Sequence, residues 1–299
     1  MCENLKPKKR YARSLDPIHI GAGGYKLGRV DNTVVRDPAT DVPKIPGTSI
    51  AGVVRAFVEI VKKEDDSDKK LEDINVEEVF GSKPESSETK KGILRFYDGQ
   101  IVFFPVSSIQ GTVWITTKEL LEEWFGEIKD GNGEKIKIPE KIEKEAYAIK
   151  GIDLKKPLNL GWLLLEVKKP EDGKEIALPP EIDKWVKRIV LVSEKLFSHI
   201  VNDNLEVRTS VRIDPVTGTA AEGALFTYEA IPRGTVFGFE IGVDNHGDKA
   251  VNVNEIVNAV SPYFKYLGIG GMGTRGFGRL ELAIEQKEES QGGETDAQS

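Results

Sequence analysis

The sequence predicts an α+β protein with a modified ferredoxin-like βαββαβ core, helical insertions and a protruding β-hairpin. Three observations support this fold class. Apolar side chains recur at helical spacing in residues 50–61 and again in residues 253–267. Segments that alternate like strands stand before and after these helices, so the order strand, helix, strand occurs twice. Two further strand-like segments flank a polar turn at residues 214–219, which predicts the hairpin.

The core, which we call the palm, is expected to take residues 8–62, 92–115 and 233–285. Its first helix should begin near Thr48 or Ser49, because both residues suit a helix N-cap. The apolar stripe of this helix consists of Ile50, Val53, Val54, Phe57, Val58 and Val61. The other palm elements are strands at 9–21, 92–105, 235–243 and 278–286 and the helix at 253–267. This RRM-like order carries two Phe at 237 and 239, which we assign to the core because the strand lacks the RNP1 pattern.

The middle of the chain, residues 116–204, is predicted to be an insertion on this palm. Thr116 and Glu119 form a capping box for a helix over 117–128. Residues 129–180 carry two glycine turns and no clear period, so we expect irregular structure there. Residues 179–201 have a helical pattern with Pro at its start, which predicts one long helix. The hairpin follows at 205–232, and the polar tail 286–299 is expected to be disordered.

Composition restricts the class of protein further. Apolar residues make up 39% of the 299 residues, enough for an ordinary core, and the one cysteine, Cys2, excludes an intramolecular disulfide. No apolar run approaches a spanning helix, and no apolar segment follows the basic start at residues 6–13, so we expect a cytoplasmic protein without a membrane partner. The net charge of −7 argues against a uniformly basic nucleic-acid binder. It leaves room for a basic face, because acidic residues gather in 62–78 and in the tail.

A glycine-rich loop at residues 268–279, GIGGMGTRGFGR, contains the spacing G-x-G-x-x-G twice. A dinucleotide fingerprint needs a strand before it and a helix after it, whereas here a helix precedes and a strand follows. A nucleotide-cofactor enzyme is therefore disfavoured. Two interpretations stay open: the loop is a tight turn that needs glycine, or its amides approach phosphate groups with Arg275 and Arg279 supplying charge.

Three separated segments together resemble a known family. Residues 17–55, 208–237 and 266–282 look like the RAMP proteins of type III CRISPR systems, and residues 103–121 and 217–226 resemble the backbone subunit of the Cmr (type III-B) complex in particular. The counterpart in the Csm (type III-A) complex is the close alternative. The motifs occur in the right order across most of residues 10–285, which makes the match far more specific than the glycine loop alone.

The resemblance implies one RAMP domain over residues 1–285, whose copies stack head to tail along a guide RNA. It implies that the hairpin acts as a thumb between bases and that an aspartate in the first long loop cuts the paired target RNA. Asp31 matches that aspartate, and the cleavage would use Mg²⁺ or Mn²⁺ with no organic cofactor. The implied partners are guide RNA, target RNA, other copies of the chain and other subunits of the complex. A guide-RNA scaffold without activity is the alternative function.

The residues themselves leave the site chemistry open. Asp31 is a lone carboxylate that could hold a divalent ion, help a ribose 2′-hydroxyl attack, or be a solvated turn residue. His19 is a second catalytic candidate, although a His at a strand end more often packs or hydrogen-bonds. The helix start at Thr48 and Ser49 could also receive a phosphate. Where the family often has a Lys, this chain has Ala51, so Lys44 or Arg55 would replace that contact.

The expected contact residues fall into two sets. The candidate RNA-binding residues are Gly21, Gly23, Lys44, Thr48, Ser49, Arg55, Gly270, Gly271, Met272, Gly273, Thr274 and Arg275. The candidate thumb residues are Arg212, Asp214, Thr217, Gly218, Thr219, Ala221 and Leu225.

Overall fold

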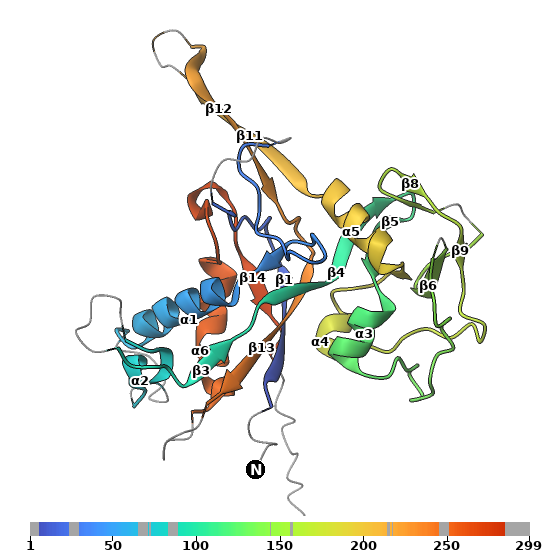
Figure 1. Ribbon diagram of the computed structural model, residues 1–299, viewed down its shortest axis with the longest axis horizontal. Coiled ribbons are helices and arrows are strands. Elements are labelled where there is room, and N and C mark those ends of the chain that lie inside the picture. Colours follow the sequence, from blue (N-terminus) through green and yellow to red (C-terminus); the bar gives the residue numbers. More distant parts are fainter. Residues whose placement is uncertain are drawn as a thin grey trace, which may run out of the picture.

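A computed structural model describes most of the chain, with the helices arranged on both faces of one large mixed sheet (Figure 1). The described residues are 6–23, 30–64, 71, 73–82, 89–143, 145–155, 158–213, 216, 218–244 and 251–284. The segment 286–299, expected to be disordered, lies outside them. No helix in the described part of the chain is long and apolar enough to cross a membrane.

The sheet has ten strands, eight of which follow one path. Their order is β14 (Leu280–Leu282), β1 (Lys8–Ser14), β13 (Val236–Val243), β4 (Gly99–Ser108), β5 (Gly111–Thr116), β10 (Ile189–Leu191), β6 (Ala146–Lys150) and β9 (Val167–Lys168). The short strands β2 (Lys44–Ile45) and β3 (Leu94–Phe96) pair with β4 and β13. All pairs from β14 to β5 are antiparallel, whereas β5 with β10 and β6 with β9 are parallel.

The predicted palm strands are present but shorter than expected. β1 ends at Ser14, and the chain then forms single bridges from Ile18 to Ile231 and from Gly21 to Val34. The strand expected at 92–105 is interrupted at Tyr97 and Asp98, so β3 and β4 pair with successive parts of β13. The last strand covers three residues rather than nine. Phe237 and Phe239 of β13 are buried, which confirms their assignment to the core.

Two helices cover one face of the palm strands. In α1 (Gly47–Val61) the buried residues are Gly47, Ile50, Val54, Phe57, Val58 and Val61, which agrees with the expected stripe except that Val53 is only partly buried. In α6 (Val253–Tyr266) Phe264 meets Phe57 edge to face, with ring centroids 5.2 Å apart. This aromatic contact joins the two helices over the sheet.

The expected cap of α1 is wrong. The N-cap residue is Pro46, which offers no side-chain cap, and neither Thr48 nor Ser49 takes that role. Instead, Asp98 in the turn before β4 accepts the amide hydrogen of Gly47 at 2.8 Å. A side chain at position 47 would place its Cβ 2.3 Å from the carbonyl oxygen of Phe96, so only glycine allows this close approach.

The long helix expected at 179–201 is also wrong. The segment forms α4 (Pro180–Asp183), then β10, then α5 (Glu194–Asp203), whose N-cap is Ser193. All three residues of β10 are buried, because β10 lies between β5 and β6 inside the sheet. Because both faces of this segment are buried, the β-branched Ile189 and Val190 are more stable in a strand than in a helix. This effect outweighs the helical period of the surrounding residues.

Two smaller expectations for the insertion need correction. Helix α3 (Lys118–Phe125) is capped by Thr117, whose hydroxyl accepts from the amide of Leu120, and Thr116 ends the preceding strand. The cap is therefore one residue later than expected, and Glu119 is not at the capping-box position. Residues 129–180 are not irregular throughout, since they contain β6, β9 and the pair β7 (Asn159–Leu160) and β8 (Leu163–Leu164).

The sheet separates two hydrophobic cores, and β4 contributes to both. Ile101, Phe104 and Val106 belong to the core that includes α1, α6 and α5. Val102 and Phe103 belong to the core that includes α3 and α4. The same sheet continues from the palm strands into the strands of the insertion, so palm and insertion share one framework.

The hairpin strands are β11 (Glu206–Ile213) and β12 (Ala220–Ala230), which pair antiparallel and project from the body (Figure 1). Their positions agree with the segment 205–232 expected from sequence. Of the expected thumb residues, Asp214 and Thr217 lie outside the described residues, as do the side chains of Arg212, Ala221 and Leu225. Gly218 and Thr219 lie in the described part of the turn.

Candidate nucleic-acid interface

Asp31 is fixed to the base of the hairpin by Thr227 of β12. Its Oδ2 accepts the Thr227 amide hydrogen at 2.7 Å and the Thr227 hydroxyl at 3.1 Å. In return, the Asp31 amide donates to the Thr227 hydroxyl oxygen at 3.1 Å. The Thr227 amide and hydroxyl hold the pKa of the Asp31 carboxyl below its usual value. Asp31 is exposed, and none of the other described residues donates to Oδ1, so an ionised oxygen faces the surroundings.

The loop that carries Asp31 runs along the free edge of β12. The Asn32 amide donates to the Thr227 carbonyl at 3.0 Å, and the Glu229 amide donates to the Asn32 carbonyl at 2.9 Å. Further along, Arg36 forms an ion pair with the Glu229 carboxylate at 2.8 Å. Loop and hairpin base are therefore joined at several successive positions and form one unit.

His19 lies on the same edge of β12 but does not contact Asp31. Its Nδ1 is 2.6 Å from the Glu229 carbonyl oxygen, and its ring packs against Tyr228. Asp31 is anchored at Thr227 and His19 at Glu229, and two residues along a strand correspond to about 7 Å. The structure brings the two catalytic candidates to one strand edge without placing them within hydrogen-bond reach of each other.

The glycine loop packs against His19. The Gly271 amide donates to the His19 carbonyl at 2.9 Å, and a Cβ on Gly270 would lie 2.6 Å from the same oxygen. Gly268 and Gly278 have positive φ; a Cβ on Gly268 would lie 2.5 Å from the Gly278 carbonyl oxygen, and a Cβ on Gly278 would lie 2.5 Å from the Ile269 carbonyl oxygen, so neither tolerates a side chain. These glycines support the tight-turn interpretation of the loop.

The tip of the same loop keeps the second interpretation open. Gly273 and Thr274, with Arg275 in the single turn η3 (Gly273–Arg275), are exposed. Among the described residues, the amides of Gly273 and Thr274 donate to no protein group. Exposed amides beside a guanidinium suit a phosphate, so phosphate binding at this tip stays a prediction.

An aromatic cluster joins the glycine loop to the hairpin. Tyr228 of β12 meets Phe277 edge to face at 5.5 Å. Arg208 of β11 lies over the Phe277 ring at 4.6 Å, and Arg275 lies over the Phe226 ring at 5.5 Å. Each guanidinium therefore lies over an aromatic ring of the other segment: the hairpin arginine over a ring of the glycine loop, and the loop arginine over a ring of the hairpin. Sequence analysis missed Arg208, although its alternation with the apolar residues of β11 was a usable signal.

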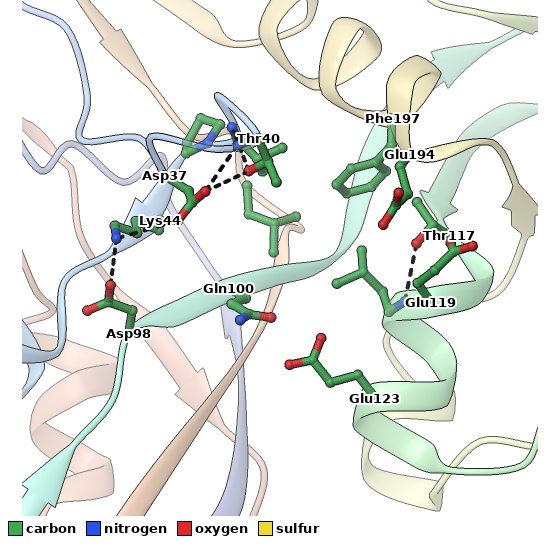
Figure 2. Close-up of a pocket in the computed structure, with 14 residues that line it drawn as sticks. Asp37, Thr40, Lys44, Asp98, Gln100, Thr117, Glu119, Glu123, Glu194 and Phe197 are labelled. Carbon is green, nitrogen blue, oxygen red and sulfur yellow. Dashed lines mark hydrogen bonds and ion pairs between the residues drawn. The ribbon is translucent and has the colours of Figure 1, made fainter.

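Lys44 does not lie in a basic environment. Its ammonium is 2.7 Å from Asp98 and 3.8 Å from Asp37, and the hydrogen bond to Asp98 raises the Lys44 pKa. It borders a pocket of about 300 Å³, which Figure 2 shows between the 37–44 loop, β4 and helices α3 and α5. The acidic residues that line this pocket are Asp37, Asp98, Glu119, Glu123 and Glu194. Five carboxylates against one paired lysine disfavour an RNA phosphate here.

The other basic and helix-start candidates lie along α1. Arg55 forms an ion pair with Glu59 at 3.4 Å and donates to the Gly81 carbonyl, so it ties α1 to the end of α2 (Val76–Phe80). Thr48 is exposed and Ser49 half-buried at the start of the helix, beside the Gly47 amide that Asp98 occupies. Gly21 and Gly23 are exposed next to His19 and the Asp31 loop.

The protein groups around Asp31 provide few ligands for a metal ion. The described residues contain no group of three or more His, Cys, Asp or Glu side chains arranged to hold one. Asp31 could contribute Oδ1, since Thr227 already occupies Oδ2. This donor set fits only a hard, partly hydrated ion such as Mg²⁺ that phosphate oxygens also ligate.

The fold and this interface define a RAMP-type protein. The family model described as the RAMP superfamily matches residues 11–281, and the chain belongs to that family. It is 30% identical over 288 residues to the CRISPR system Cmr endoribonuclease Cmr4 of Pyrococcus furiosus, covering 91% of this chain and 94% of the relative. It is 23% identical over 269 residues to the CRISPR system Cms endoribonuclease Csm3 of Methanothermobacter thermautotrophicus, covering 89% of this chain and 78% of the relative.

Solved structures support the same fold. A chain in the cryo-EM structure of type III-B Cmr-beta in the apo state aligns with a TM-score of 0.71 at 18% identity, covering 95% of this chain and 99% of that one. The same complex bound to cognate target RNA gives a TM-score of 0.68 at 19% identity, covering 93% and 96%. The resemblance inferred from the sequence motifs is therefore confirmed at the level of the family.

Proposed function

We propose that this protein is a backbone subunit of a type III-B CRISPR effector complex. In this role it binds guide RNA together with further copies of itself and cleaves complementary target RNA at regular intervals. The observation that carries the proposal is the ionised Asp31 carboxylate fixed at the hairpin base, in a chain that is 30% identical to a relative named a Cmr endoribonuclease. The Csm-type alternative is less favoured, because the Csm3 relative that matches most of the chain is only 23% identical over 269 residues.

The architecture supports a palm and thumb arrangement. Strands β14, β1, β13 and β4 are consecutive and antiparallel, with α1 and α6 over one face, as a ferredoxin-like palm requires. The projecting pair β11 and β12 would be the thumb between bases, and the Arg208 and Arg275 guanidiniums would meet the RNA backbone at its base. Copies that track one strand would associate head to tail, because only a heterologous interface repeats along it.

The chemistry assigned to Asp31 follows from its surroundings. RNA cleavage by its own 2′-hydroxyl forms a bond from O2′ to phosphorus and breaks the bond from phosphorus to O5′, while water takes the O2′ proton and supplies one to the leaving O5′. A carboxylate whose pKa is lowered is a weak proton acceptor at neutral pH, which makes it a poor general base. The better role for Oδ1 is to hold a partly hydrated divalent ion, which would stabilise charge on the scissile phosphate.

The test is cleavage by a complex assembled with the guide RNA and all subunits. Asp31→Asn should leave assembly and target binding close to wild type and remove regularly spaced products. The matched control is Asp37→Asn in the same loop, whose carboxylate serves the turn by accepting the amides of Ala39 and Thr40. Cleavage by Asp31→Asn at the wild-type rate would mean that the catalytic group is not Asp31. It would favour the alternative in which this chain is a guide-RNA scaffold without activity.

A further inference from the structure

We infer that Thr227 is a positioning residue for target cleavage, holding the Asp31 carboxylate in one orientation relative to the hairpin. The inference rests on the proposed function, since it assigns a role to Thr227 through Asp31. Thr227 lies 196 residues from Asp31 in the sequence and makes three hydrogen bonds with it. No other described side chain hydrogen-bonds the Asp31 carboxylate.

The geometry makes the contact specific to threonine or serine at this position. The Thr227 hydroxyl donates to Oδ2 and accepts from the Asp31 amide, so one oxygen serves both the side chain and the backbone of Asp31. A hydroxyl is able to donate and accept at once, whereas an apolar side chain does neither. The branched Cβ of threonine also restricts χ1, which keeps the hydroxyl where Asp31 needs it.

Orientation matters because Asp31 is exposed. A surface carboxylate samples several rotamers unless hydrogen bonds select one, and a catalytic group has to stay within about 0.5 Å of its productive position. The Thr227 amide and hydroxyl both bind Oδ2, which directs Oδ1 outward in one orientation. The hydroxyl therefore supplies half of the contacts that select the rotamer, and the backbone supplies the other half.

The location of Thr227 adds a second consequence. Thr227 belongs to β12, so the Asp31 carboxylate is hydrogen-bonded to one of the two strands of the hairpin. In the β11 and β12 register Thr227 stands opposite Thr209, and its amide and carbonyl bond the Asp31 loop instead of β11. The rate of cleavage should depend on this contact, while the spacing between cuts should not.

The experiment compares Thr227→Val, Thr227→Ser and Thr227→Ala in the full guide-loaded complex with complementary RNA. Valine keeps the shape of threonine and removes the hydroxyl, whereas serine keeps the hydroxyl. Alanine also lacks the hydroxyl, and it shows whether an effect of valine comes from its packing. The matched control is Thr209→Val, the same change directly across the hairpin on a residue that makes none of the hydrogen bonds to Asp31. Assembly on guide RNA, target affinity and the single-turnover rate at saturating target are measured for each.

Thr227→Val and Thr227→Ala should cleave roughly 10- to 100-fold more slowly at saturation, with unchanged target affinity and unchanged product spacing. Thr227→Ser should recover most of the rate, and Thr209→Val should match wild type. A wild-type rate for Thr227→Val, or a serine variant as slow as valine, overturns the inference while Asp31→Asn still tests the proposed function. A loss confined to target affinity assigns Thr227 to binding and overturns positioning.

Discussion

His19 and Glu229 are joined through the His19 Nδ1, which lies 2.6 Å from the Glu229 carbonyl oxygen. A carbonyl oxygen only accepts hydrogen bonds, so Nδ1 carries the hydrogen. On its other side, the His19 carbonyl accepts the Gly271 amide. His19 therefore connects the hairpin strand to the glycine loop, and its contacts are those of a structural brace.

We predict that His19→Asn keeps cleavage within about threefold of wild type, because the Asn side-chain amide donates in place of Nδ1. His19→Ala should lower the unfolding free energy by about 1–3 kcal/mol, since the half-buried Glu229 carbonyl loses its donor. Thermal unfolding and cleavage by the assembled complex check the pair. Loss of cleavage in His19→Asn at unchanged melting temperature would show that the ring itself acts in catalysis.

Arg275 should contribute to RNA binding without reading sequence. Arg275→Ala is expected to weaken guide-RNA binding about fivefold for every sequence and to flatten the salt dependence of log Kd by about 0.7, the value for one single-strand phosphate contact. The control is Arg279→Ala, whose guanidinium is already engaged by Asp16 at 2.5 and 3.1 Å. Filter binding at several salt concentrations measures both. A preference at one base position in Arg275→Ala would contradict phosphate contact.

Asp98 should stabilise the start of α1. Asp98→Ala removes the acceptor of the Gly47 amide and should cost about 1 kcal/mol of unfolding free energy, as the loss of a helix cap does. Asp98→Asn keeps an acceptor oxygen and loses only the ion pair with Lys44, so it should cost less. Denaturant unfolding at pH 7 measures both variants. An equal cost for the two would mean that the ion pair, and not the helix cap, is the stabilising contact.

The contribution of Asp98 should also depend on pH. Burial alone would raise the Asp98 pKa, but the hydrogen bonds from Lys44 and Gly47 outweigh it and leave the pKa below its usual value. A group whose pKa is lower in the folded protein stabilises fully above its unfolded pKa, about 4, and loses that effect as the pH falls through the folded value. The stability difference between wild type and Asp98→Ala should therefore persist from pH 7 to about 5 and shrink below about 4.

Removal of divalent ions should stop target cleavage without releasing RNA. Chelation with EDTA is expected to abolish product formation, and added Mg²⁺ or Mn²⁺ should restore it. The melting temperature of the isolated subunit should not change, because the described residues form no multi-ligand metal cluster that folding would depend on. Undiminished cleavage in EDTA would mean that protein groups alone stabilise the scissile phosphate.

Periodicity predicted α1 and α6 well, because each helix buries one stripe of apolar side chains, and β13 was predicted as an apolar strand that is buried along most of its length. Periodicity failed where strands distant in sequence determine the secondary structure. The three residues of β10 form a strand only because β5 and β6 pair with them on either side. The prediction for the start of α1 failed for a related reason. The partner of the Gly47 amide is Asp98, 51 residues away, and local sequence does not reveal it.

The candidate site shows the same division. Asp31 was identified through its match to a family motif and His19 as a histidine at a strand end, and the structure places both on the edge of β12. Thr227 was missed because the contact spans 196 residues. The alternation of residues 226–229 placed Thr227 and Glu229 on one face of a strand, but nothing in that pattern indicated which loop would lie against it.

The continuous sheet limits how the chain could be shortened. Cutting out residues 116–204 to obtain a minimal palm would remove α3, β10 and β6 and uncover the side of the sheet where Val102 and Phe103 are now completely buried. The strands left behind would present an apolar face and an unpaired edge, both of which promote aggregation. The chain should therefore melt in a single cooperative transition, and its evolution should add or lose residues in surface turns while retaining the whole sheet.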